Sequence, residues 1–287
     1  RETANGAVAE ILHADGTRSE RACDILVGAD GIHSALRQQF YPDEGAPRWN
    51  GMMMWRGTTL ARPFLDGRTM VQAGHRRAKF VVYPIEPVRP DGLQRINWIC
   101  DRRLREDGFG GGLTAPSRED WSKPGSLDDL LPTFGSWRFA WLDVPGLIRA
   151  AEQILEWPMV DRDPLPRWRH GHTTLLGDAA HPMYPIGSNG ATQAILDAAA
   201  LADALDGHAS ITAALNAYEA ARLPMTRDIV AMNRREGLDA ILDMVEEAAP
   251  EGFARIEDVT DPTVLAEWVQ AYKKAAGHQV GRPQSAP

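Results

Sequence analysis

The sequence predicts a mixed α/β protein, and three observations support this fold class. The apolar segment 173–176 leads into a loop rich in Gly and Pro, and an Ala/Leu-rich segment with helical spacing follows at 191–206. Four β-rich stretches succeed one another between residues 53 and 100. From residue 210 onward the apolar spacing is that of long amphipathic helices. The chain therefore combines a strand–loop–helix part, a sheet and C-terminal helices.

The expected strands are short and are bounded by Gly, Pro and polar residues. Alternating or continuous apolar runs of this length are typical of strands that are buried on at least one side. They are expected at 8–12, 25–27, 53–61, 69–73, 79–85, 94–100, 154–159 and 173–176.

The expected helices are fewer and longer. One begins near residue 33 and ends near residue 40, a loop and helical region covers 103–151, and another helix covers 191–206. The segment 210–245 is predicted as a long helix with a kink or break at Pro224, because proline lacks the backbone N–H group. Residues 282–287 are expected to form a disordered tail.

Composition restricts the function classes. The chain has 287 residues, 44% of them hydrophobic, and a net charge of -8, so a nucleic-acid partner is not expected. No run of 18 apolar residues occurs, and a membrane span is therefore not expected either. Cys23 and Cys100 have neither a disulfide framework nor metal-ligand spacing, which is typical of the reducing cytoplasm and predicts no metal site.

The most informative segment is 177–191, Gly-Asp-Ala-Ala-His-Pro-Met-Tyr-Pro-Ile-Gly-Ser-Asn-Gly-Ala. Asp178 lies at the carboxyl end of the preceding strand, where open α/β sheets bind their ligands. The helix that starts at Asn189 and Gly190 exposes unpaired backbone N–H groups and the positive end of its dipole. An anionic or electron-rich ligand is expected there. His181, inside Ala-Ala-His-Pro, is expected to order the loop rather than to act as a base.

A second segment, 24–37, is consistent with the first. It reads Asp-Ile-Leu-Val-Gly-Ala-Asp-Gly-Ile-His-Ser-Ala-Leu-Arg, a short apolar strand followed by Asp30 between two glycines and then the start of a helix. The two segments together resemble motifs of the FAD-dependent aromatic-ring monooxygenases, the family that includes the hydroxybenzoate and salicylate hydroxylases. The run 177–191 is similar to the second flavin-binding motif, and 24–37 to the Asp-Gly motif. Segments 49–57, 67–75 and 183–190 look most like the phenazine branch of the family.

The resemblance implies a flavoprotein that uses FAD, with NADH or NADPH and O2, to hydroxylate an aromatic substrate. A phenazine carboxylate is the first candidate and a salicylate-like acid the second; the choice between NADH and NADPH stays open. It also implies an FAD-binding hydroxylase fold with a β-sheet substrate domain and C-terminal helices. The family's Gly-x-Gly-x-x-Gly turn is absent, since the run 108–112 is predicted as a flexible loop, so we expect the chain to be a C-terminal portion. The C-terminal amphipathic helices are compatible with a homodimer.

Three parts are expected on this basis. Residues 1–50 and 152–207 would be the remaining FAD-binding domain, 51–151 the substrate-binding sheet, and 208–287 a C-terminal helical segment.

The resemblance also implies site residues. Chemistry would take place on the flavin, so no side chain is expected to be catalytic by itself, and Pro185 would line the oxygen-transfer position. The residues expected to contact the cofactor are Gly177, Asp178, Pro185, Gly187, Ser188, Asn189, Gly190, Ala191, Thr192, Asp30 and Gly31. Those expected to contact the substrate are Trp55, Arg56, Tyr83, Met183 and Tyr184.

Two other classes stay open. The chain could be a catalytically inactive apo fragment or binding module, or a flavin reductase or halogenase of the same fold. Trp137 to Trp141 does not match the Trp-x-Trp-x-Ile-Pro signature of the flavin halogenases. The Met and Trp side chains near residue 55 could equally be ordinary core.

Overall fold

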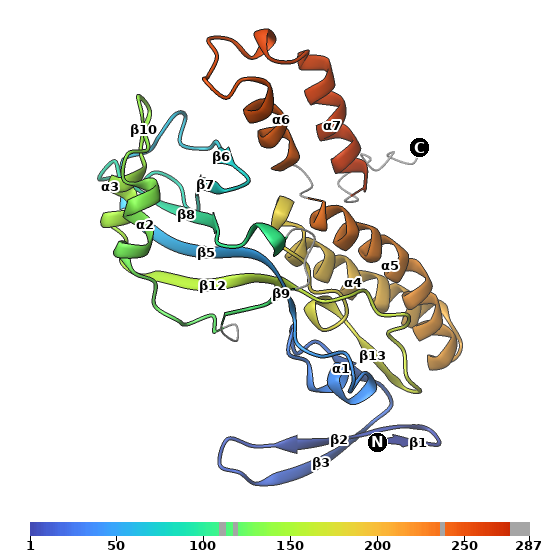
Figure 1. Ribbon diagram of the computed structural model, residues 1–287. Coiled ribbons are helices and arrows are strands. Elements are labelled where there is room, and N and C mark those ends of the chain that lie inside the picture. Colours follow the sequence, from blue (N-terminus) through green and yellow to red (C-terminus); the bar gives the residue numbers. More distant parts are fainter. Residues whose placement is uncertain (109–112, 117–119, 236–238, 276–287) are drawn as a thin grey trace. The chain divides into compact units, whose positions relative to one another are not determined.

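The computed structural model describes residues 1–108, 113–116, 120–235 and 239–275, and of 272–275 only the backbone (Figure 1). The chain divides into two compact units. The first comprises residues 1–48, 160–238 and 263–287, and the second comprises 49–159 and 239–262. The expected tail at 282–287 and most of the Gly-rich run at 108–112 lie outside the described residues.

The first unit contains two small sheets. Strands β1 (Glu2–Thr3), β2 (Gly6–Leu12) and β3 (Arg18–Cys23) form an antiparallel meander. Strands β4 (Leu26–Gly28) and β13 (Thr173–Leu175) pair in parallel, with Leu26 opposite Thr173. The strands predicted at 8–12, 25–27 and 173–176 are thus confirmed. Because β4 and β13 are parallel, their carboxyl ends meet at the same edge, so the Asp-Gly turn after β4 and the loop after β13 both start there.

Helices pack around β13 in the first unit. They are α1 (Ala35–Phe40), α4 (Gly190–Gly207) and α5 (Ile211–Arg234), and α7 (Pro262–Ala275) is assigned largely to the same unit. The core around the strand contains Leu175, Leu201, Leu215 and Tyr218. The Tyr218 hydroxyl donates to the carbonyl oxygen of Leu175 at 3.1 Å, so the end of β13 is tied directly to α5.

Of the kink or break predicted at Pro224, the break is wrong. Helix α5 is continuous from Ile211 to Arg234. Buried residues on both sides of Pro224, Tyr218 and Arg222 before it and Ile229 and Val230 after it, hold the helix in place. Tertiary packing therefore offsets the missing hydrogen bond of the proline. The expected helix at 210–245 is instead two helices, because α6 (Ala240–Ala248) is separate.

The second unit is built on a six-stranded sheet. Its order is β12-β5-β8-β7-β6, with β9 (Leu113–Thr114) paired to β5 (Figure 1). The main strands are β5 (Arg48–Ala61), β6 (Val71–His75), β7 (Ala78–Pro84), β8 (Gln94–Arg103) and β12 (Ile154–Asp161). All five strands predicted between residues 53 and 159 are therefore confirmed.

Alternation along the strands gives this sheet two different faces. Trp55, Gly57 and Thr59 on β5 share one face with Trp98 on β8 and Phe80 on β7. Helices α2 (Leu127–Phe134) and α3 (Val144–Arg149) contact this face. The rings of Phe80 and Phe134 lie 6.3 Å apart, and the Thr59 hydroxyl donates to the carbonyl oxygen of Leu147 at 2.7 Å.

Smaller elements complete the second unit. The hairpin of β10 (Arg138–Phe139) and β11 (Leu142–Asp143) leads into α3. Among the described residues, none of the helices has the length and apolar character needed to cross a membrane.

Gly57 tests the packing of the helix-covered face. A Cβ at this position would lie 2.3 Å from Cζ2 of the fully buried Trp98, so an added methyl group must displace that ring. We expect Gly57→Ala to lower the free energy of unfolding by about 1–3 kcal/mol in urea titrations. Gly207→Ala, at a position with open space, is the control and should change it by less than about 0.5 kcal/mol. Equal effects of the two substitutions would contradict the packing described here.

Candidate functional site

The loop between β13 and α4 has an unusual backbone conformation. It contains two 3₁₀ turns, Gly177–Ala179 and Ile186–Ser188. Gly177 and Gly187 have φ values of 61° and 73°, which glycine adopts without strain. Ser188 has φ of 56°, a value that side chains with a Cβ rarely adopt. Such a conformation persists only where the surrounding structure holds it.

The loop presents a carboxylate beside the start of a helix. Asp178 is exposed, and no described residue donates a hydrogen bond to its carboxylate. Although its side chain reaches solvent, the surrounding loop partly desolvates the carboxyl and raises its pKa, while the nearby His181 has the opposite effect. A Cβ built on Gly190 would meet only Oδ1 of Asp178, at 3.9 Å. Two predicted residues twelve positions apart are therefore neighbours, with open space in front of them.

Most of the other predicted residues of this loop form its accessible rim, but Gly177 and Asn189 do not. Pro185, Ser188 and Ala191 are exposed, and Gly187, Gly190 and Thr192 are half-buried. Asn189 is buried, and its carbonyl oxygen accepts the first bond of α4, from the N–H group of Gln193 at 2.9 Å. The N–H groups of the first turn have no earlier helical carbonyl as partner. Open space at Gly190, an available carboxylate and these N–H groups fit a ligand with hydroxyl groups and an electron-rich edge.

The Asp-Gly segment lies where β4 ends. The carboxylate of Asp30 accepts from the N–H group of Ala35 at 2.7 Å, and the Ser34 hydroxyl accepts from the N–H group of Arg37 at 3.0 Å. Both side chains thus accept hydrogen bonds from backbone N–H groups at the start of α1, which have no partner within the helix. Gly31 has φ of 81°, and no atom lies within 4 Å of the Cβ position. Asp30 is exposed and Gly31 is half-buried, so both remain accessible.

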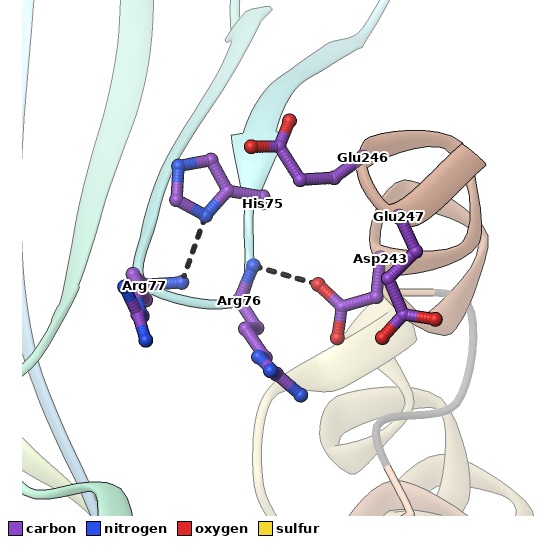
Figure 2. A pocket seen from close by; sticks show the side chains of 6 residues that line it. All are labelled: His75, Arg76, Arg77, Asp243, Glu246 and Glu247. Atoms are coloured by element: carbon purple, nitrogen blue, oxygen red, sulfur yellow. Dashed lines mark hydrogen bonds between the residues drawn. The ribbon is translucent and has the colours of Figure 1, made fainter. Parts of the chain in front are cut away.

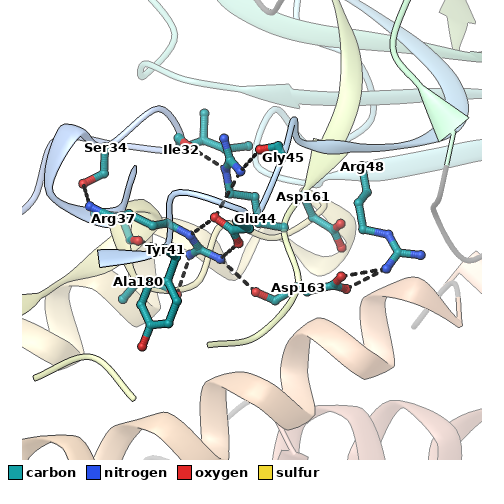
Figure 3. A network of polar contacts seen from close by, with 12 residues as sticks. Ile32, Ser34, Arg37, Tyr41, Glu44, Gly45, Arg48, Asp161, Asp163 and Ala180 are labelled. Atoms are coloured by element: carbon teal, nitrogen blue, oxygen red, sulfur yellow. Dashed lines mark hydrogen bonds and ion pairs between the residues drawn. The ribbon is translucent and has the colours of Figure 1, made fainter. Parts of the chain in front are cut away.

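Sequence reasoning missed the role of Arg37. The side chain is only 1% exposed, and Nη1 donates to the carbonyl oxygens of Ala179 and Ala180 at 3.1 and 2.9 Å (Figure 3). Its other nitrogens bind the carboxylate of Glu44 and the carbonyl oxygen of Asp163. A single buried guanidinium therefore connects the Asp-Gly motif to the loop that carries Asp178. The only signal in the sequence was its place at the end of the motif, because the carbonyls it binds lie 142 and 143 residues further along the chain.

The predicted substrate residues fall into both units. In the second unit, Trp55 is 2% exposed on the helix-covered face, and Nε1 donates to Glu156 at 3.0 Å. Arg56 and Tyr83 lie on the opposite face, and Nε of Arg56 donates to Oδ1 of Asn97 at 2.7 Å. Asn97 is a residue that sequence reasoning missed: it is fully buried, and its Nδ2 group has no acceptor in the described part of the chain.

Met183 and Tyr184 belong to the first unit and are both buried. Met183 packs against Ile229 and Val230. The carbonyl oxygen of Tyr184 accepts from Nδ2 of Asn233 at 3.0 Å, and burial raises the pKa of its phenol. In this arrangement both side chains contribute to the core beneath the loop.

A pocket in the second unit contains none of the predicted site residues. It lies between the turn that joins β6 to β7 and α6, and its lining is charged (Figure 2). The N–H group of Arg76 donates to Asp243 at 2.9 Å, which attaches α6 to that turn. The lining residues are His75, Arg76, Arg77, Asp243, Glu246 and Glu247. In the described residues, no group of three or more His, Cys, Asp or Glu side chains is arranged to hold a metal ion.

Comparison with known proteins agrees with this geometry. Residues 145–233 match the family model described as an FAD binding domain. The chain is 48% identical over 211 residues to phenazine 1,6-dicarboxylic acid hydroxylase PhzS of Lysobacter antibioticus, covering 73% of this chain and 50% of that protein. It is 29% identical to the salicylate hydroxylase of Pseudomonas putida, covering 76% of this chain and 52% of that protein. The chain spans about half the length of the curated relatives it matches.

Solved structures show the same fold. Klebsiella pneumoniae HpxO, complexed with FAD and uric acid, superimposes with a TM-score of 0.63 at 23% identity, covering 96% of this chain and 61% of HpxO. A salicylate hydroxylase substrate complex superimposes with a TM-score of 0.64 at 22% identity, covering all of this chain and 70% of the other.

The parallel strands, the loop bounded by glycines and the helix that follows define a flavoprotein fold of the hydroxylase type. The chain belongs to the family of FAD-dependent aromatic-ring hydroxylases. The predicted fold class and the family are thereby confirmed, and the family model that matches 145–233 is that of an FAD binding domain.

The Arg37 contacts lead to a stability prediction. Replacing Arg37 with Met removes the donor to two loop carbonyls and one of the two guanidinium groups that bind Glu44, while the contact from Arg162 at 3.1 Å remains. We expect the free energy of unfolding to fall by about 3 kcal/mol or more, measured by urea denaturation, because one half of a buried polar network loses its partner. Arg18→Met, which removes only the exposed ion pair with Glu10, is the control and should cost about 0–1 kcal/mol. Similar losses for both variants would exclude a special role for Arg37.

Proposed function

We propose that this protein is an FAD-dependent monooxygenase that hydroxylates a phenazine carboxylate, with NADH or NADPH and O2 as co-substrates. The observation that carries the proposal is the 48% identity to a phenazine 1,6-dicarboxylic acid hydroxylase. A salicylate-like acid is the second candidate substrate, supported by the more distant salicylate hydroxylase. Two unpaired cysteines, Cys23 and Cys100, are compatible with the cytoplasm as its compartment.

The loop residues have distinct tasks in this proposal. Asp178 accepts hydrogen bonds from hydroxyl groups of the cofactor. The first turn of α4 directs its N–H groups and its dipole at the edge of the ring system where negative charge collects, and such preorganised donors stabilise an anion. Pro185 offers a rigid apolar surface at the loop rim. The remaining predicted contacts, Asp30 and Gly31 included, stay proposals of the same kind. Bound FAD supplies the electron transfer and oxygen chemistry, while the protein positions the reactants and excludes water.

Gly190 provides a direct test of the cofactor site. A side chain there has room within the protein, so Gly190→Leu should leave the fold intact and obstruct the ligand. We expect this variant to bind FAD at least about tenfold more weakly than the wild-type chain, which corresponds to about 1.4 kcal/mol. Binding is measured by the flavin absorption retained after desalting and by titration.

The matched control is Gly207→Leu, at the opposite end of α4, where a side chain also meets open space. It should bind FAD like the wild-type chain. Unchanged affinity of the Gly190 variant would refute the proposed position of the flavin. If the wild-type chain binds no flavin at all, the rival proposal of an inactive binding module gains support.

Arg56 is the proposed anchor for a substrate carboxylate. Its exposed guanidinium makes no ion pair with a described residue, and Nε is held by Asn97. A guanidinium fixed in this way is suited to bind a carboxylate through its other N–H groups. Tyr83 lies on the same face of the sheet. Because Trp55 lies on the helix-covered face, we propose for it a supporting contact through β5.

We expect Arg56→Gln to raise KM for phenazine 1,6-dicarboxylate by about tenfold or more, since a hydrogen bond to a charged group contributes about 1.5–3 kcal/mol. NAD(P)H oxidation and product formation are measured together with the FAD-loaded protein, so that uncoupled oxidation is recognised. Arg62→Gln, an exposed arginine just beyond the end of β5, is the control and should leave KM unchanged. NAD(P)H consumption without a hydroxylated product would favour a reductase, and a chlorinated product in the presence of chloride would favour a halogenase.

The proposed homodimer concerns the C-terminal helices. Helix α6 has no buried residue, although its apolar side chains gather on one face. Light scattering of the purified chain gives its mass in solution, and the mass of a monomer would overturn this part of the proposal.

A further inference from the structure

We infer that His181, Asp197 and Arg222 form a buried positioning relay that holds the cofactor-binding loop in the conformation that receives the flavin. His181 is the positioning residue of this relay rather than a catalytic one. The inference rests on the proposed function, because it assigns these three residues a role in flavin affinity. It concerns only the first unit, in which all three residues lie.

Asp197 is the centre of the relay. It lies on α4, is completely buried, and both of its carboxylate oxygens are used. Oδ2 accepts from Nε2 of His181 at 2.5 Å and from the N–H group of Gly177 at 3.1 Å. Oδ1 accepts from Nε of Arg222, on α5, at 2.7 Å. One carboxylate therefore fastens both ends of the segment 177–181 to two helices.

The fastened segment carries Asp178. Gly177 and His181 enclose this residue in the sequence, and the N–H group of His181 also donates to the carbonyl oxygen of Gly177 at 2.9 Å. The backbone of Asp178, and with it the direction of the Cα–Cβ bond, is therefore held as long as these bonds persist. The same helix that supplies Asp197 begins at Gly190, so one rigid element sets the position of the carboxylate and of the first helical turn together.

The charges of the relay indicate a positional role. Asp197 and Arg222 are a buried ion pair, and replacing such a pair with well-packed apolar residues of similar size often leaves a fold equally stable or more stable. Arg222 is held in turn by Oε1 of Gln193 at 2.6 Å. A buried network whose members are directed by hydrogen bonds is suited to select one conformation, because few other arrangements satisfy its charges.

Only one of the two ring nitrogens of His181 has a hydrogen-bond partner among the described residues. Its Nε2–H donates to Asp197, which assigns the tautomer, whereas Nδ1 is buried and has no partner among the described residues. The ring packs at 5.4 Å from that of Trp168. A residue that only filled this space would be apolar, since an unpaired buried nitrogen is unfavourable. The bond to Asp197 is therefore the property that distinguishes histidine at this position.

Gln and Asn at position 181 carry the same amide group but place it at different distances from Asp197. The amide of Gln at position 181 reaches as far as Nε2 of histidine and can donate to Asp197, whereas the amide of Asn is one bond shorter and cannot. We expect His181→Asn to weaken FAD binding by about tenfold or more relative to the wild-type chain, and His181→Gln to stay within about threefold of wild type. Asp197→Asn should resemble His181→Asn.

A variant of another buried residue tests whether His181 affects FAD binding only through the stability of the fold. Tyr218→Phe removes the hydrogen bond from α5 to Leu175 but leaves the relay intact. It should lower the melting temperature without a change in FAD affinity. If FAD affinity instead follows the melting temperature across all four variants, or if His181→Asn binds FAD like the wild-type chain, the inference is overturned.

Amide hydrogen exchange of the cofactor-free chain makes the test independent of the proposed function. Peptides covering 177–190 should exchange faster in the His181→Asn variant than in the His181→Gln or Tyr218→Phe variants. If the wild-type chain binds no FAD while this exchange pattern holds, the proposed function fails for this chain and the relay stands. Equal exchange in the three variants would overturn the relay, whatever the result for FAD.

Discussion

The contacts of Arg37 with the carbonyl oxygens of Ala179 and Ala180 are the interaction on which the candidate site depends. These carbonyls belong to a loop that leaves the sheet and turns back into a helix, so no strand or helix partner is available to them. Buried backbone oxygens need a donor. A guanidinium has enough donors to satisfy both and to bind Glu44 and Asp163 as well. The loop that carries Asp178 is thus supported from α1.

The second support comes from α4 and α5. Asp197 on α4 binds Gly177 and His181, and Arg222 on α5 completes that group. Both supports use buried charges, although apolar packing would stabilise the fold at least as well. The result is a loop in which Ser188 keeps a positive φ and Asp178 keeps its carboxylate available. Binding a cofactor at little cost in ordering requires this kind of preorganisation.

Much of the fold could be predicted because the relevant signals are local. The strands of the sheet from β5 to β8 show their alternation and their Gly and Pro boundaries in the sequence itself, and each lies within a few residues of its expected range. The expected break at Pro224 failed for the opposite reason. Local propensity favours a break there, while core packing on both sides of the proline keeps α5 continuous. Contacts between residues that are distant in the sequence, rather than local propensity, thus determined the course of α5.

The sequence by itself determined the motifs, the family that they resemble and the expectation of FAD, because each motif is a continuous stretch of the chain. Only the tertiary structure decided which side chains support the motifs through hydrogen bonds and packing. It placed Arg37 against a loop more than 140 residues away in the chain and brought Asp178 next to Gly190. It also assigned Trp55 and Arg56 to opposite faces of one sheet. The physical reason is that a buried charge finds its partner through the packing of distant elements, which no local pattern records.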